Sequence, residues 1–212
     1  MTTLFIDSHM HTPLCKHAVG EPEEYAAVAE QRGLKGIVFT CHNPIPNGWA
    51  ASVRMAPEEF ETYLSLVERA RVAWSGRVEI RLGLECDYVP GMEPWLKQLL
   101  ARAEFYYILG SVHPHLPEYK AEYFRGDVAQ FQRTYFEHLA MAAETELFDA
   151  LAHPDLVKNV FPREWDTLRM MDDITRSLDR IALTGTAMEL NTSGLLKDIP
   201  EMNPSRAILQ EM

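Results

Sequence analysis

The stretch EPEEYAAVAEQRGLKGIVFTCH, residues 21–42, contains two different patterns in succession. Its first part has a proline near the start, acidic residues in the first turn and Gly33 at the end. These features together predict a helix over residues 21–34. The second part, KGIVFTCH, is a short apolar run and predicts a strand over residues 35–42. A helix that leads into a buried strand is the repeating unit of α/β proteins.

The same alternation continues on both sides of this stretch. Further strands are predicted at LFIDSHMH (4–11), VEIRLGLECDY (78–88), FYYILGSVH (105–113), FDALAHP (148–154) and TAMELNTS (186–193). The segments between them predict helices over residues 57–74, 93–103, 127–148 and 164–181, and a last helix begins within NPSRAILQEM (203–212). Alternation of this kind implies parallel strands joined by crossover helices. We expect a closed or nearly closed barrel, with an open doubly wound sheet as the alternative.

The composition indicates an ordinary globular protein. With 212 residues, 47% hydrophobic and 24% charged, the chain is expected to form a single domain over residues 1–212. The net charge of -11 argues against nucleic acid as a partner. No apolar run approaches the roughly 20 residues that span a bilayer. The first four residues lack a signal-peptide pattern, and Cys15, Cys41 and Cys86 form no CxxC pair. We therefore expect a cytoplasmic protein with reduced thiols and no membrane contact.

Histidines and one glutamate end the predicted strands. Alternation along the first strand places Asp7, His9 and His11 on one face, and the next four strands end at His42, Glu85, His113 and His153. This carboxyl-terminal edge is where barrel active sites are built. Imidazole and carboxylate ligands suit Zn, Fe or Mn, so the thiols are interpreted as non-ligands, with Cys41 beside His42 kept open. The alternative is an exposed, histidine-rich strand end that binds metal only adventitiously.

Six motifs, DSHMHT, CKHAVG, FTCH, GLECDY, GSVHP and AHPDL, occur in an order that resembles the polymerase and histidinol phosphatase (PHP) superfamily. Within it, HAVGEPEEYAAVAEQRGLKGIVFT and LGLECDY resemble the histidinol-phosphatase branch. The resemblance implies a distorted seven-stranded, TIM-like barrel with a centre of two to three divalent metal ions. By resemblance, His9 and His11 bind the first metal, Glu85 bridges it to a second metal that His113 and His153 also bind, and His17 and His42 hold the third.

Two departures from the family pattern accompany the resemblance. Cys41 stands where the family usually has an aspartate, and this change is expected to loosen the orientation of the His42 imidazole. The family also supplies an Asp-x-His pair from a seventh strand, and the 212 residues contain no such motif after the sixth predicted strand. The barrel is therefore expected to lack its final strand, and the first and third metals are each expected to lack one ligand.

The resemblance implies a metal-dependent phosphomonoesterase, namely a histidinol-phosphatase that acts late in histidine biosynthesis. Clustered cations lower the pKa of a bound water to about 7 and neutralise the phosphoryl oxygens. The catalytic candidates are Glu85 and His115, the latter as a general acid or simply a loop histidine. Asp7 is a candidate to orient a ligand imidazole, and Arg54, Arg125, Arg133, Lys158 and Arg163 are candidates to contact the substrate. The alternatives are a PHP nuclease acting on nucleic-acid ends and a metal-binding domain that has lost catalysis.

Overall fold

The computed structural model describes residues 5–212. They fall into two compact units, the first covering Met1–Cys86 and Gln98–Ile108 and the second covering Asp87–Lys97 and Leu109–Met212. Residues 1–4 lie outside the described residues. They include Leu4, the first residue of the first predicted strand, and they are the segment that lacks a signal-peptide pattern. Each unit is described below by itself.

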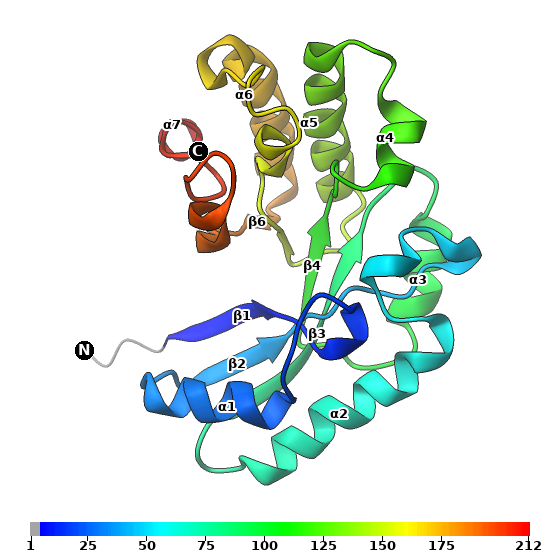
Figure 1. The fold of residues 1–212 in the computed structure, drawn as a ribbon, viewed down its shortest axis with the longest axis vertical. Helices are drawn as coiled ribbons and strands as arrows, with labels where there is room; N and C mark the ends of the chain where they lie inside the picture. The colour runs from blue at the N-terminus through cyan, green and yellow to red at the C-terminus, as the bar shows by residue number, and fades with distance from the viewer. Residues whose placement is uncertain (1–4) are drawn as a thin grey trace. The chain divides into compact units, whose positions relative to one another are not determined.

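The first unit is built on parallel strands with helices between them. Its strands are β1 (Ile6–Met10), β2 (Gly36–Phe39) and β3 (Glu79–Asp87). The last residue of β3, Asp87, belongs to the second unit. The helices of the first unit are α1 (Pro22–Gln31) and α2 (Phe60–Ala73). Short 3-10 turns occupy Pro13–Cys15, Pro46–Gly48, Ala51–Val53 and Pro57–Glu59. Helices α1 and α2 lie side by side (Figure 1). Both β1–β2 and β2–β3 pair in parallel, as the alternation predicts.

The register of these strands aligns their carboxyl ends. Gly36 pairs with Glu79 and Phe39 with Leu82, and the same register continues to an isolated bridge between His42 and Glu85. Gly83 allows β2 and β3 to approach closely, because an added Cβ would lie 2.7 Å from Cγ2 of Thr40 and 2.9 Å from Cγ1 of Val38. The aligned register therefore brings a histidine and a glutamate, far apart in the chain, to adjacent positions.

The second unit repeats the strand and helix alternation. Its strands are β4 (Tyr107–Ser111), which begins in the first unit, β5 (Ala150–Leu151) and β6 (Ala187–Met188), and the pairs β4–β5 and β5–β6 are parallel. Its helical segments are α4 (Pro117–Tyr123), α5 (Val128–Glu144), Leu156–Asn159, α6 (Thr167–Thr184), Thr192–Leu196 and α7 (Arg206–Glu211), while α3 (Glu93–Leu100) spans the boundary between the units. Helices α5 and α6 pack along one another (Figure 1).

The predicted α/β class is confirmed, with six strands among residues 5–212. Asp127 caps α5, since its side chain accepts a hydrogen bond from the backbone N–H of Gln130. The sequence did not reveal α4, a helix of 7 residues that follows the β4 loop. Strands β5 and β6 have 2 residues each and are shorter than predicted. Within the described part of the chain, no helix is both long enough and apolar enough to cross a membrane.

Candidate metal centre

Three imidazoles of the first unit converge on one carboxylate oxygen. Oε2 of Glu85 lies 3.2 Å from Nε2 of His9, 3.5 Å from Nε2 of His11 and 3.0 Å from Nδ1 of His42. His17 joins them, since its ring centroid lies 5.0 Å from that of His11 and 5.1 Å from that of His42. We call these five residues the first cluster. The sequence predicted every one of them as a metal ligand.

The fold explains why the first cluster forms. His9 and His11 alternate with Met10 at the end of β1, so both face the same side, and the continued register of β2 and β3 sets His42 beside Glu85. Lys16 then adopts a left-handed conformation with φ of 66°, which turns the chain sharply before His17. The Lys16 ammonium group donates to the carbonyl oxygen of Ala51 and holds this turn in place.

The donor set of the first cluster fits a divalent cation. The Glu85 side chain is 0% exposed, and a buried carboxylate is costly unless a positive charge or several hydrogen bonds compensate it. Neutral imidazoles compensate only weakly, whereas a metal ion compensates fully and binds imidazole nitrogen and carboxylate oxygen together. The close grouping of His9, His11 and Glu85 donor atoms, all within 4.8 Å of one another, is the grouping that such an ion requires.

Two buried thiols lie at the base of the first cluster. Cys41 accepts a hydrogen bond from Oγ1 of Thr12 over 3.2 Å, and its backbone N–H donates to the hydroxyl of Tyr63. Burial raises the pKa of the Cys41 thiol. A hydrogen bond from Cys41 lowers the pKa of the Cys15 thiol, and His11 and His17 lower it further against the effect of burial. Cys41, expected to act on the orientation of His42, is thus anchored by Thr12 and Tyr63 next to Cys15.

The second unit contains its own cluster, formed by Asp87, His113, His115, His153 and Glu189. Nδ1 of His113 lies 2.9 Å from Oδ1 of Asp87, which is 2% exposed. The His113 ring centroid lies 5.0 Å from that of His153 and 5.4 Å from that of His115, which packs edge-on. Loss of hydration and the two neighbouring imidazoles lower the pKa of His115, so this ring is neutral near pH 7. The structure therefore groups the three histidines that the sequence singled out in this unit.

Carboxylates of this second cluster orient the histidines. A His113 ring that donates from Nδ1 to Asp87 keeps the lone pair of Nε2 for another partner. His153 has a φ of 30°, which is unusual for a residue other than glycine, and its backbone N–H donates to Oε2 of Glu189 over 2.9 Å. Sequence reasoning missed both Asp87 and Glu189. The available signal for Asp87 was its position in GLECDY, two residues after Glu85.

The remaining candidates occupy different environments. Arg54 is 2% exposed and donates from one guanidinium nitrogen to the carbonyl oxygen and the side-chain oxygen of Asn43. Lys158 is 0% exposed and binds Asp155 and the carbonyl oxygen of Met202. Arg125 and Arg163 are exposed, and Arg133 is half-buried. Asp7 accepts a hydrogen bond from the backbone N–H of His9 over 3.3 Å, a contact with the chain and not with an imidazole ring.

Comparison with known proteins identifies the family. The model of the PHP domain matches residues 7–193, which cover both clusters. The chain belongs to the PHP domain family. A protein from Deinococcus radiodurans, named a probable histidinol-phosphatase, is 37% identical over 206 residues, which are 94% of this chain and 77% of that protein. The histidinol-phosphatase of Bacillus subtilis is 32% identical over 93 residues, which are 41% of this chain and 35% of that protein.

Solved structures share the fold at lower sequence identity. A protein from Listeria monocytogenes, provisionally assigned as a histidinol phosphatase, superposes with a TM-score of 0.85 at 20% identity, covering 97% of this chain and 89% of that one. The histidinol phosphate phosphatase of Lactococcus lactis, crystallised with zinc, L-histidinol and phosphate, has a TM-score of 0.74 at 18% identity and covers 97% of this chain and 80% of that one. At these identities the likeness establishes the fold of this PHP protein.

Proposed function

We propose that this chain hydrolyses L-histidinol phosphate to L-histidinol and phosphate in a metal-dependent reaction. The observation that carries the proposal is the convergence of His9, His11 and His42 on the buried carboxylate of Glu85, a donor set built for divalent cations. The substrate follows from the 37% identical relative, which is named for this activity and matches 94% of the chain. The Lactococcus lactis protein of the same fold was crystallised with both products of this reaction and with zinc.

Both clusters supply ligands in this proposal, for two to three divalent ions of the Zn, Fe or Mn type. Such ions supply hydroxide at neutral pH and neutralise charge on the phosphoryl oxygens. The contribution of the chain is to fix the ligands. Glu85 is the shared anion of the first cluster, and Asp87 holds the Nδ1 proton of His113 so that Nε2 can bind a cation. The lowered pKa of His115 leaves the ring without a proton to donate as an imidazolium near pH 7 and also makes it a weak base, so it does not support the general-acid role for this residue.

The cationic candidates divide into two roles under this proposal. Arg54 and Lys158 are buried and engaged by Asn43 and Asp155, so they support the fold around the clusters from inside. Arg125, Arg133 and Arg163 reach solvent and remain the candidates for contact with the phosphate group. Replacement of one of these three by glutamine should raise KM for histidinol phosphate if it contacts the phosphate, and should leave KM unchanged otherwise.

The test is phosphate release by the metal-stripped protein after addition of Zn²⁺, Fe²⁺ or Mn²⁺ separately. L-histidinol phosphate and a 5′-phosphorylated oligonucleotide are offered in parallel, with a chelator as the negative control. We expect release from histidinol phosphate with at least one metal and none in chelator. Preferential release from the oligonucleotide would support a nuclease instead, and metal binding without turnover of either substrate would indicate a binding domain.

A further inference from the structure

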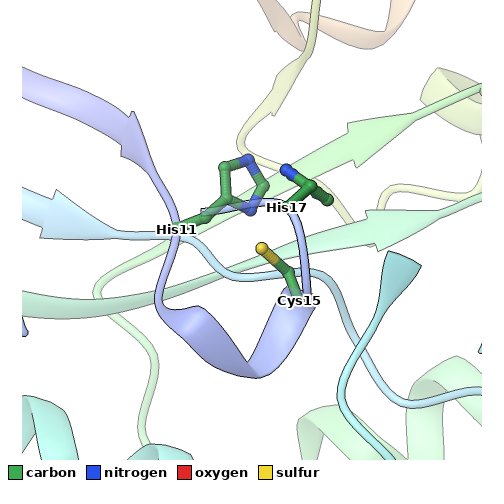
Figure 2. Close-up of side chains that lie close together, drawn as sticks. All are labelled: His11, Cys15 and His17. Atoms are coloured by element: carbon green, nitrogen blue, oxygen red, sulfur yellow. The ribbon is translucent and has the colours of Figure 1, made fainter. Parts of the chain in front are cut away.

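The turn that follows β1 brings a thiol to the edge of the first cluster. The ligand atoms of His11, Cys15 and His17 all lie within 4.8 Å of one another. Figure 2 shows the three side chains on the same side of this turn, with the sulfur of Cys15 below the two imidazoles. Cys15 is 0% exposed, so the sulfur faces the protein interior and the cluster. Two nitrogens and one sulfur therefore surround one small space.

Local structure holds these donors in place. The backbone N–H of Cys15 donates to Thr12 over 3.1 Å, and that of Lys16 donates to Pro13 over 2.9 Å, which closes the 3-10 turn Pro13–Cys15. Lys16 then takes its left-handed conformation, with φ of 66°. Such a conformation is unfavourable for a residue with a Cβ and persists where the surrounding structure imposes it, often at functional sites. Here it sends the chain back so that His17 and Cys15 approach the same point.

We propose that Cys15 coordinates, through its sulfur, the metal ion that His17 holds, with His11 as a further donor. This inference rests on the metal dependence proposed above and adds a ligand to it. From the sequence, the thiols are interpreted as non-ligands because the imidazole and carboxylate groups suit a metal without them, with Cys41 kept open. The turn geometry reverses that interpretation for Cys15. The thiolate form of Cys15 is the form that binds the ion.

A thiolate ligand changes which metal the site selects. Sulfur is a soft ligand that favours Zn²⁺ over Mn²⁺ or Mg²⁺, whereas imidazole and carboxylate accept a wider range of ions. The set of His11, Cys15 and His17 is therefore a zinc-type site, and the set of His9, His11 and Glu85 can accept Zn, Fe or Mn. Cys41, which shares a hydrogen bond with the Cys15 thiol, would support the ligand sulfur from behind. The metals of this protein are then not equivalent.

Cobalt substitution tests the inference without any substrate, so its outcome does not depend on the proposed hydrolase activity. The reduced, metal-stripped protein is titrated with Co²⁺, and thiolate ligation is read from the sulfur-to-cobalt charge-transfer absorption in the near ultraviolet. We expect this band in the wild-type protein and in Cys86→Ala, a matched control because Cys86 is also 0% exposed in the same unit. The band should be lost in Cys15→Ser and retained in Cys41→Ser.

Zinc X-ray absorption of the wild-type protein provides the second measurement, which is needed if Cys15→Ser does not fold. A sulfur ligand gives a shell at about 2.3 Å, distinct from nitrogen and oxygen at about 2.0–2.1 Å. Absence of a sulfur shell, or absence of the charge-transfer band when Co²⁺ is bound, would overturn the proposal. A band that survives in Cys15→Ser and disappears in Cys41→Ser would assign the ligand to Cys41 and would also overturn it.

Discussion

The two histidine clusters use their carboxylates in different ways. In the first cluster, a single carboxylate oxygen of Glu85 lies within 3.5 Å of nitrogens from His9, His11 and His42. In the second cluster, His113 has Asp87 at 2.9 Å, and the backbone of His153 has Glu189 at the same distance. One arrangement shares an anion among three histidines, and the other gives His113 and His153 one anion each.

This difference indicates two roles for the carboxylates, namely compensation of the charge of a bound cation by Glu85 and orientation of histidines by Asp87 and Glu189. In the proposed centre Glu85 acts as a ligand, because its oxygen lies at the point at which the imidazole nitrogens meet. Asp87 lies 2.9 Å from Nδ1 of His113 and would favour the ring form that carries its proton on that nitrogen. Glu189 acts one step further away, since it accepts a hydrogen bond from the backbone of His153, a residue with a positive φ. Removal of a ligand costs more than removal of a group that orients a ligand. The predictions below follow that order.

Glu85→Gln is expected to have the largest effect. The substitution preserves shape and removes the negative charge that would compensate the cations, so phosphatase activity should fall by about 10²–10³-fold, the range seen when a key electrostatic group is lost. Metal content, measured by mass spectrometry after desalting, should fall as well. Cys86→Ala, at the adjacent buried position of β3, should keep both metal and activity. Full metal content in Glu85→Gln would refute the shared role of this carboxylate.

Asp87→Asn is expected to have an intermediate effect. The amide can still meet Nδ1 of His113, yet it lacks the charge that favours the Nδ1–H form and strengthens Nε2 as a ligand. We expect a loss of about 10–100-fold in metal affinity or activity, the usual range for groups behind a metal-binding histidine. Excess metal should restore part of the activity, because the ligands themselves are intact. Ser111→Ala, which removes a weaker contact of 3.4 Å to the same carboxylate, is the milder comparison. Equal effects of the two substitutions would contradict the role of the Asp87 charge.

The ligand residues could be predicted from the sequence because strand ends are easy to place. His42 and Glu85 follow short apolar runs, and parallel strands bring their carboxyl ends to one edge, so two residues 43 positions apart become an isolated bridge. Residue type then indicates metal chemistry. The order of elements was predictable for the same reason, since the hydrophobic period changes at each boundary.

The turn and the orienting groups could not be predicted in this way. The approach of His17 to Cys15 depends on the left-handed conformation of Lys16, and lysine gives no sequence signal for a positive φ. Glu189 acts through a hydrogen bond to a residue 36 positions away, a separation that no local pattern reports. The buried Lys158 ammonium group donates to the carboxylate of Asp155 and to the carbonyl oxygen of Met202, which lies 44 positions after Lys158 in the chain. Local periodicity describes elements, whereas these contacts depend on how distant segments meet.

Glu189→Gln is expected to have a smaller effect than Asp87→Asn. The glutamine oxygen can still accept from the backbone N–H of His153, so only the additional strength of a hydrogen bond to a charged group is lost. A loss of about 1 kcal/mol corresponds to roughly a fivefold decrease in kcat/KM or in metal affinity. Glu189→Ala, which removes the acceptor altogether and leaves the positive φ of His153 without this support, should be clearly worse. Identical kinetics for the two variants would mean that this contact does not hold the histidine.

The smallest effect on activity is expected at His138, a histidine of the second unit that lies in α5 outside both clusters. It is 6% exposed, its Nδ1 lies 2.8 Å from the hydroxyl oxygen of Tyr119, and its ring packs edge-on against Tyr123. Burial lowers the pKa of His138 from 6.5 to about 4, although the neighbouring charge of Glu137 opposes this shift. Protonation would charge the buried ring and leave its Nδ1 able only to donate to the Tyr119 oxygen.

This depressed pKa predicts a pH dependence of stability that is separate from metal binding. Between pH 6.5 and about 4 the unfolded chain protonates His138 and the folded protein does not, so stability falls as the pH decreases through this range. His138→Gln keeps an acceptor for Tyr119 and cannot titrate, so its midpoint of thermal unfolding should fall less steeply with decreasing pH. The comparison uses metal-stripped protein, in which the cluster histidines titrate alike in both forms and cancel in the difference. Activity of the metal-loaded variant at neutral pH should equal that of the wild type. Parallel stability curves for the two proteins would show that His138 is protonated in the folded state as readily as in the unfolded chain.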